Sequence, residues 1–306
     1  MDHARLLSPL TIGAITVKNR IVMPAFNLSY TPDGRIDERV IAFYEARAEG
    51  GAGMLVVGGC AVQAVGRGRN MIGVYDDGFS EGLSRLTARL KARGATVICQ
   101  LFHGGAYAKG ADGDSVAPSA VYSNYSKQTP RALSAGEVDA VLRDFASAAF
   151  RAKEAGFDGV ELIGSAGYLL SQFLSPLKNK RDDAYAWQEK ESPFAEALIR
   201  GIKARCGSEY PVVVRISGNE FVEGGRGSAG AIAAARVSEA AGADALSVTG
   251  GWHESRVPQI TAHLPEAGYA YLAREVKQAV RLPIFAANRI DDPYVAEDLL
   301  ASGSAD

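Results

Sequence analysis

The sequence feature that most constrains the fold is a repeated junction between a helix and a strand. A helical stretch ends at a glycine, one or two small residues follow, and a short apolar run begins; this happens at Gly51, Gly94, Gly156 and Gly242. Short apolar runs bounded by glycine are typical of strands buried on both faces. Strands that alternate with helices form right-handed βαβ units and a parallel sheet. The repeat therefore predicts an α/β fold.

The number of repeats narrows the fold further. The apolar runs predict seven strands, at residues 19–25, 54–58, 96–102, 160–163, 212–216, 245–248 and 283–287. Helical spacing predicts helices at 37–50, 79–93, 134–155, from 192 onward, 229–241, 269–280 and 293–301. Asp37 is expected to cap the first helix, Ser134 and Glu137 to form a capping box, and Pro193 to open a helix.

An eighth unit begins at residues 302–306, where the sequence stops. Seven units and the start of an eighth predict a TIM (β/α)8 barrel, as one domain over residues 1–306, truncated at the start of strand eight with its eighth β/α unit missing. Such a barrel would expose two unpaired edges. The alternative is a doubly wound open sheet, but no G-x-G-x-x-G turn follows the first strand.

Charge and cysteine usage exclude several classes of protein. Lys and Arg total 33 against 35 Asp and Glu, which argues against nucleic acid or an anionic membrane as a partner. No apolar run approaches the roughly 20 residues of a membrane span. The three cysteines, Cys60, Cys99 and Cys206, are odd in number and widely spaced, as expected for free thiols of a reducing compartment. We expect a soluble cytoplasmic protein.

Active sites of such barrels lie at the C-terminal ends of the strands. The residues expected there are Pro24, Ala25, Asn27, Gly58, Gly59, Cys60, Gln100, His103, Tyr168, Arg215, Thr249, Trp252, His253, Asn288 and Arg289. They include no Asp/Glu cluster with metal spacing, so no metal site is predicted, and no lysine, which argues against a Schiff-base aldolase. Hydrogen-bonding groups, fixed cations and candidate proton donors together favour a bound organic cofactor. Glu161 lies mid-strand and is expected to pair inside the barrel.

Several stretches together resemble the flavin barrel of the Old Yellow Enzyme family, and within it the branch of bacterial 2,4-dienoyl-CoA reductases. They span residues 7 to 290, and the most specific are the run from Gly159 to Leu169 and Gly251-Trp252-His253, which lies within a matching stretch from Gly250 to Arg256. The others are Leu7-Ser8-Pro9-Leu10-Thr11-Ile12-Gly13, Lys18-Asn19-Arg20-Ile21-Val22-Met23-Pro24, Gln100-Leu101-Phe102-His103-Gly104-Gly105, Val214-Arg215-Ile216-Ser217 and Asn288-Arg289-Ile290. The resemblance implies an FMN-dependent oxidoreductase that takes hydride from NAD(P)H and reduces an activated C=C bond.

The resemblance also implies roles for individual residues. Those expected around FMN are Pro24, Ala25 and Cys60 along the isoalloxazine, Gln100 at its pyrimidine edge, Arg215 near N1 and O2, and Asn288 and Arg289 at part of the phosphate. Tyr168 is expected to give the proton, with His253 supporting or relaying it. Arg215 could instead form an ion pair with Glu161, His253 could be a structural loop histidine, and His103 could belong to either class.

The chain departs from the family in two ways. Ile163 and Ala166 stand where many members carry residues that bind the carbonyl oxygen of the substrate. We therefore expect the small-molecule substrate to be another unsaturated compound, such as a CoA thioester, and not a simple enone. The sequence also lacks the eighth strand, and the 4Fe-4S and FAD segments that often follow it are expected only in a longer form. Left open are an amine dehydrogenase-like flavoenzyme, disfavoured because no aromatic cage is evident, a phosphate-ligand lyase or isomerase, a truncated barrel without activity, and assembly as a homo-oligomer.

Overall fold

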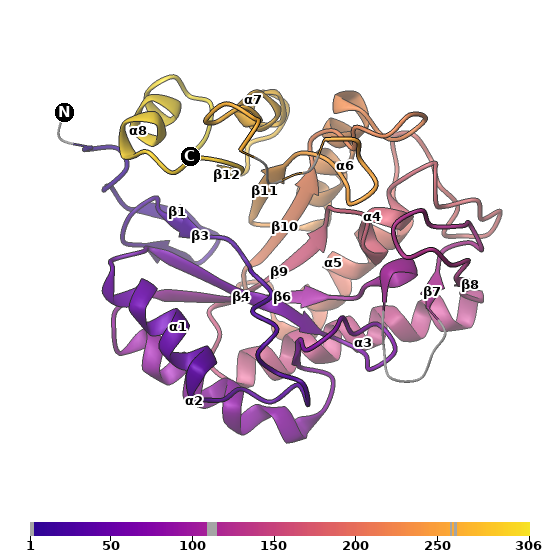
Figure 1. Ribbon diagram of the computed structural model, residues 1–306, viewed down its shortest axis with the longest axis horizontal. Helices are drawn as coiled ribbons and strands as arrows, with labels where there is room; N and C mark the ends of the chain where they lie inside the picture. The colour runs from indigo at the N-terminus through magenta and orange to yellow at the C-terminus, as the bar shows by residue number, and fades with distance from the viewer. Residues whose placement is uncertain (1–2, 109–114, 258, 260–261) are drawn as a thin grey trace.

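A parallel sheet that curves into most of a barrel forms the centre of the molecule (Figure 1). The computed structural model describes residues 3–108, 115–257, 259 and 262–306. The strands lie in the order β12-β11-β10-β9-β6-β4-β3, with the short β5 beside β4, and every pair is parallel. Their bounds are β3 Val22–Met23, β4 Met54–Ala61, β5 Ile72–Gly73, β6 Thr96–Phe102, β9 Gly159–Gly164, β10 Val212–Ser217, β11 Ala245–Thr249 and β12 Ile284–Ala286. All seven predicted strands are confirmed.

The first strand is shorter than the predicted 19–25. Pro24 has no N–H to give to a neighbouring strand. At the other end, the side chain of Asn19 accepts from the amide of Ile21 at 3.1 Å and donates to the carbonyl of Gly51 at 2.8 Å. This local turn replaces ladder bonds, so only Val22 and Met23 pair as a strand.

Helices cover the outer face of the sheet, as the repeat predicts (Figure 1). Their bounds are α1 Glu38–Glu49, α2 Ser80–Lys91, α3 Ala135–Glu154, α4 Leu169–Phe173, α5 Pro193–Cys206, α6 Ser228–Ala241, α7 Ala270–Lys277 and α8 Pro293–Ala301, with 3-10 turns η1 Asp77–Phe79 and η2 Gly105–Tyr107. The Asp37 cap, the Ser134–Glu137 capping box and the proline in the first turn of α5 are all confirmed. Within the described residues, no helix is long and apolar enough to cross a bilayer.

The inner face of the barrel is built in layers because side chains alternate along each strand. An apolar layer closes the bottom, together with the hairpin β1 Leu10–Ile12 and β2 Ile15–Val17. Its members are Ile12, Val17, Met54, Val56, Ile98, Val213, Ala245 and Phe285. Two residues further along the strands, Gln100, Arg215 and Ser247 follow Ile98, Val213 and Ala245, and Glu161 pairs with Gln100 in register. A polar layer thus lies between the apolar floor and the mouth.

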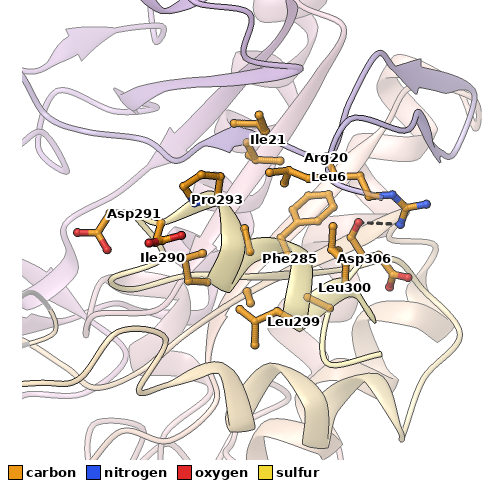
Figure 2. A pocket seen from close by; sticks show the side chains of 15 residues that line it. Leu6, Arg20, Ile21, Phe285, Ile290, Asp291, Pro293, Leu299, Leu300 and Asp306 are labelled. Carbon is orange, nitrogen blue, oxygen red and sulfur yellow. Dashed lines mark hydrogen bonds between the residues drawn. The ribbon is translucent and has the colours of Figure 1, made fainter. Parts of the chain in front are cut away.

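The barrel is open between β12 and β3. Among the strands that the structure describes, none lies between these two. A cavity of about 310 Å³ occupies the gap, lined by Phe285, Ile290, Pro293, Leu299 and Leu300 among others (Figure 2). We call this gap, with its cavity, the seam.

The end of the chain enters the seam beside Ile284, at the N-terminal end of β12. The amide of Asp306 donates to the carbonyl of Ile284 at 2.9 Å, and its carboxylate accepts from the amide of Ile284 at 3.0 Å. From the opposite side, Arg20 donates to the carbonyl of Asp306 at 2.9 Å (Figure 2). The predicted start of an eighth unit therefore lies alongside β12.

Candidate active site

The loops that follow β9, β10 and β11 are joined to one another at the mouth of the barrel. Ala166 forms a parallel bridge with Trp252, and the amide of His253 donates to the carbonyl of Ala166 at 3.2 Å. Ser217, at the end of β10, donates to the carbonyl of Gly251 at 2.9 Å. These bonds fix the two loops that carry Tyr168 and His253.

The structure brings Tyr168 and His253 together, although they lie 85 residues apart. The Tyr168 hydroxyl and His253 Nε2 are 2.7 Å apart, and their ring centroids are separated by 5.2 Å. Burial raises the pKa of Tyr168, with a smaller contribution from Tyr125, and burial lowers the pKa of His253. At neutral pH the pair is therefore a protonated phenol beside a neutral imidazole, and either group can donate, depending on the imidazole tautomer. Such a pair can supply a proton to a substrate and replace it through the histidine.

Three further aromatic rings, which were not predicted from the sequence, surround this pair. Tyr125 stacks on His253 with centroids 4.6 Å apart and planes at 14°. Phe102 contacts the ring of Tyr168 at 4.6 Å, and Tyr107 lies edge-on to Tyr125, Tyr168 and His253 at 4.9, 6.2 and 5.9 Å. The expectation that no aromatic enclosure is present is therefore corrected. The sequence signal that could have indicated two of these rings is the group of tyrosines at 107, 122 and 125.

Beneath the mouth, the polar layer offers a ligand both a cation and an amide. Gln100 donates through Nε2 to Glu161 at 2.7 Å, and Arg215 donates through Nη1 to Ser247 Oγ at 2.5 Å. Burial raises the pKa of Glu161 and lowers that of Arg215, while the charge of each opposes the shift of the other. In the described part of the chain, the bond of Glu161 goes to Gln100 and not directly to Arg215. The amide oxygen of Gln100 and the remaining N–H groups of Arg215 are left for a ligand.

Cys60 does not point where the sequence analysis expected. Its side chain has 0% exposure, lies in the core between sheet and helices with Cys99, and donates to the carbonyl of Val57 at 3.7 Å. The cause is a register shift between β4 and β6 at Val57 to Cys60, which turns the thiol outward. Only the backbone of Cys60 could line a flavin. Pro24 and Ala25, by contrast, follow β3 and retain exposed surface.

Asn288 and Arg289 follow β12, but their side chains bind neighbouring protein groups. Asn288 accepts from Thr249 Oγ1 at 2.7 Å and donates to the carbonyl of Gln259 at 3.0 Å. Arg289 donates to the carbonyls of Ala262, at 2.9 Å, and Leu264. Their contact with a phosphate stays a prediction, and it would require these bonds to be exchanged.

Both ring nitrogens of His103 are bonded to protein groups. The residue is 1% exposed, its Nδ1 accepts from the amide of Gly105 at 3.0 Å, and its Nε2 lies 3.0 Å from Gln63 Oε1. Because Nδ1 is an acceptor, the proton sits on Nε2 and is donated to Gln63. Burial lowers the pKa of His103 to about 4, so the ring is neutral and its two nitrogens are committed.

The chain is similar in sequence and in fold to several known proteins. A family profile described as the NADH:flavin oxidoreductase / NADH oxidase family matches residues 5–306. A metal reductase of Desulforamulus reducens is 44% identical over 304 residues, which cover 98% of this chain and 46% of that protein. The structure of a 2-naphthoyl-CoA reductase with 2-naphthoyl-CoA superposes with a TM-score of 0.94 at 30% identity, over 99% of this chain and 49% of that one. The old yellow enzyme homologue from Zymomonas mobilis gives 0.82 at 26% identity, over 98% and 86%. The chain thus spans about half the length of the first two of these proteins.

Proposed function

The chain belongs to the NADH:flavin oxidoreductase / NADH oxidase family, and on that premise we propose that it is the FMN barrel of an NAD(P)H-dependent reductase acting on the C=C bond of an unsaturated acyl thioester. The resemblance to the Old Yellow Enzyme family is confirmed, as are the TIM-barrel fold and the use of FMN and NAD(P)H. The thioester substrate, the residue roles and the single-domain assignment are proposals.

The observation that carries the proposal is the 2.7 Å contact between Tyr168 and His253 at the mouth of the barrel. FMN, when bound, would supply the hydride chemistry that links NAD(P)H to the substrate. A conjugated thioester that has accepted hydride is an enolate and must be protonated on carbon. Tyr168 supplies that proton, because its raised pKa keeps the phenol protonated at neutral pH. His253 bonds the hydroxyl and returns a proton to it.

The polar layer suits the cofactor. The pyrimidine edge of a flavin alternates carbonyl oxygens with an N–H, and the amide oxygen of Gln100 can accept from that N–H. The guanidinium of Arg215 places a positive charge beneath the mouth, which would favour an anionic reduced form of a flavin held there. Pro24 and Ala25 would line its ring, and the backbone of Cys60 would lie beside it.

The substrate class follows from what the β9 loop lacks. Ile163 and Ala166 carry no hydrogen-bonding side chain, so the mouth has no donor at these positions for the carbonyl oxygen of a small enone. The similar 2-naphthoyl-CoA reductase carries an aromatic thioester. Both observations favour an acyl-CoA, with 2,4-dienoyl-CoA as one member of the class. Three buried free thiols support the assignment to the cytoplasm.

The aromatic enclosure supports amine oxidation as a second candidate. Tyrosine faces attract cations, and Tyr125 is 49% exposed beside His253. An amine substrate would reduce oxidised flavin, whereas an unsaturated thioester would oxidise reduced flavin.

One experiment separates these candidates. The full chain is loaded with FMN, reduced anaerobically with NADH, and mixed with 2,4-hexadienoyl-CoA or cyclohexenone while flavin absorbance is followed. The thioester is expected to reoxidise the flavin at least about tenfold faster than the enone. A faster reaction with cyclohexenone would contradict the thioester assignment. Bleaching of the oxidised protein by an aromatic amine, without reoxidation by either acceptor, would favour the second candidate.

A further inference from the structure

A buried polar cluster lies directly behind the Tyr168–His253 pair. Its centre is Glu254, the residue after His253, whose side chain is 9% exposed. The Tyr107 hydroxyl donates to Glu254 Oε1 at 2.7 Å, Ser123 Oγ donates to the same oxygen at 3.1 Å, and Lys178 Nζ lies 3.2 Å from it. Lys178 also donates to the carbonyl of Tyr122 at 3.2 Å. Four segments of the chain therefore meet at one carboxylate.

Two residues of this cluster, Glu254 and Tyr107, each lie next to one member of the Tyr168–His253 pair. Glu254 is the neighbour of His253 in the chain. Tyr107 packs against Gly167, the neighbour of Tyr168, so closely that a Cβ at Gly167 would lie 2.6 Å from the Tyr107 ring. The Tyr107–Glu254 bond therefore ties the loop that carries Tyr168 to the loop that carries His253. The ring of Tyr107 also lies edge-on to both side chains.

The electrostatics favour a fixed arrangement. Burial alone would raise the pKa of Glu254, but the bonds from Tyr107 and Lys178 outweigh it and lower the pKa. Glu254 is therefore ionised, and its charge is balanced by Lys178, whose side chain is 8% exposed. Hydrogen bonds to an ionised acceptor are shorter and stronger than neutral ones. A phenol bonded in this way holds its ring in one orientation.

We propose that Tyr107 and Glu254 are positioning residues of the reduction: anchored by Lys178 and Ser123, they set the distance between Tyr168 and His253. This inference rests on the proposed function for its kinetic consequence. Its structural consequence, the environment of the His253 imidazole, is independent of any substrate.

The test is Tyr107→Phe in the full FMN-loaded chain, which keeps the ring and removes only the hydroxyl. Reoxidation of the reduced flavin by 2,4-hexadienoyl-CoA is expected to slow by about 10–100-fold, the range for a misplaced catalytic group. Reduction of the flavin by NADH is expected to stay unchanged. Tyr185→Phe is the matched control, because it removes a hydroxyl bonded to a carboxylate of α3, Asp139, at 2.5 Å.

A double-mutant cycle distinguishes positioning from general destabilisation. If Tyr107 acts through His253, Tyr107→Phe has little further effect once His253→Ala is present. An equal slowing in both backgrounds would overturn the proposal. Glu254→Gln alone leaves Lys178 as an uncompensated buried charge, so it is paired with Lys178→Met. This double variant is expected to fold and to slow the same half-reaction.

The readout without substrate is the nitrogen NMR spectrum of histidine-labelled protein. The sequence has four histidines, so His253→Ala assigns the signal of interest. Tyr107→Phe is expected to shift the His253 nitrogens and Tyr185→Phe to leave them in place. An unchanged His253 signal in Tyr107→Phe would overturn the positioning role. If the wild-type chain fails to reduce the thioester while the signal shifts, the proposed function fails and the positioning role stands.

Discussion

The sheet ends in two places: at the mouth of the barrel, where the strands reach their C-terminal ends, and at the seam between β12 and β3. The two places differ in how many bonds connect the groups around them. At the mouth, side chains and loop backbones after β9, β10 and β11 bond to one another, through Ala166, Trp252 and Ser217. At the seam, two strand edges face a cavity of about 310 Å³, which Arg20 spans by its bond to the carbonyl of Asp306. We infer that the bonds at the mouth hold the side chains of the candidate active site in place, whereas the packing at the seam contributes mainly to the stability of the fold.

The comparison predicts that a change at the mouth alters rates and a change at the seam alters unfolding. The largest effect is expected for Tyr168→Phe, which removes the proton donor and should slow substrate reduction by about 10²–10⁴-fold. Flavin reduction by NADH and the urea midpoint should change little. Stopped-flow measurement of the two half-reactions checks this. Tyr294→Phe, on α8 beside the seam, is the control, and equal slowing in both variants would contradict the assignment.

Two phenylalanines test the packing of the seam. Phe194 stacks on Phe173 with centroids 3.8 Å apart in the continuous core, whereas Phe285 borders the cavity. Phe→Ala typically costs 3–5 kcal/mol, and less where packing partners are missing. We expect a loss in the free energy of unfolding of about 4 kcal/mol for Phe194→Ala and about 3 kcal/mol or less for Phe285→Ala. Urea unfolding at neutral pH measures both. A larger loss at Phe285 would show that the seam is as tightly packed as the core.

The pH dependence of the free energy of unfolding tests whether His103, which follows β6 at the mouth, is buried as a neutral imidazole. Burial lowers the pKa of His103 to about 4 from 6.5, so between these values the unfolded chain binds a proton that the folded chain does not. Stability is then complete above pH 6.5 and falls as the pH drops toward 4, by about 3 kcal/mol for this residue. His103→Gln should lose this part of the slope. Urea unfolding of both proteins from pH 4 to 7 provides the difference, and parallel curves would contradict a buried neutral imidazole.

The same division explains what could be predicted from the sequence. The strands and helix caps depend on local patterns, and the pairing of Tyr168 with His253 follows from their places after two strands of one barrel. The outward turn of Cys60 depends on a register shift between β4 and β6, which no local pattern marks. Tyr107 lies in the 3-10 turn η2 and Tyr125 in a separate turn, and only tertiary contacts show the role of these two rings. The side chain of Arg289 is long enough to reach several carbonyl groups, so the sequence does not predict which of them it binds; that depends on how the loop folds.

The smallest expected effect concerns Arg20, whose side chain crosses the seam. Arg20 donates to the carbonyl of Asp306 at 2.9 Å and to Ser8 Oγ at 3.0 Å, both partly exposed to water. Bonds of this kind contribute about 0.5–1.5 kcal/mol each, so Arg20→Ala should lower the free energy of unfolding by about 1–2 kcal/mol. Arg143→Ala, at an exposed position of α3, should have a smaller effect. Because Arg20 lies at the end of the barrel opposite the mouth, both half-reactions should keep their wild-type rates. A slowed half-reaction in Arg20→Ala would mean that the seam and the mouth are mechanically coupled, and the division between them would not hold.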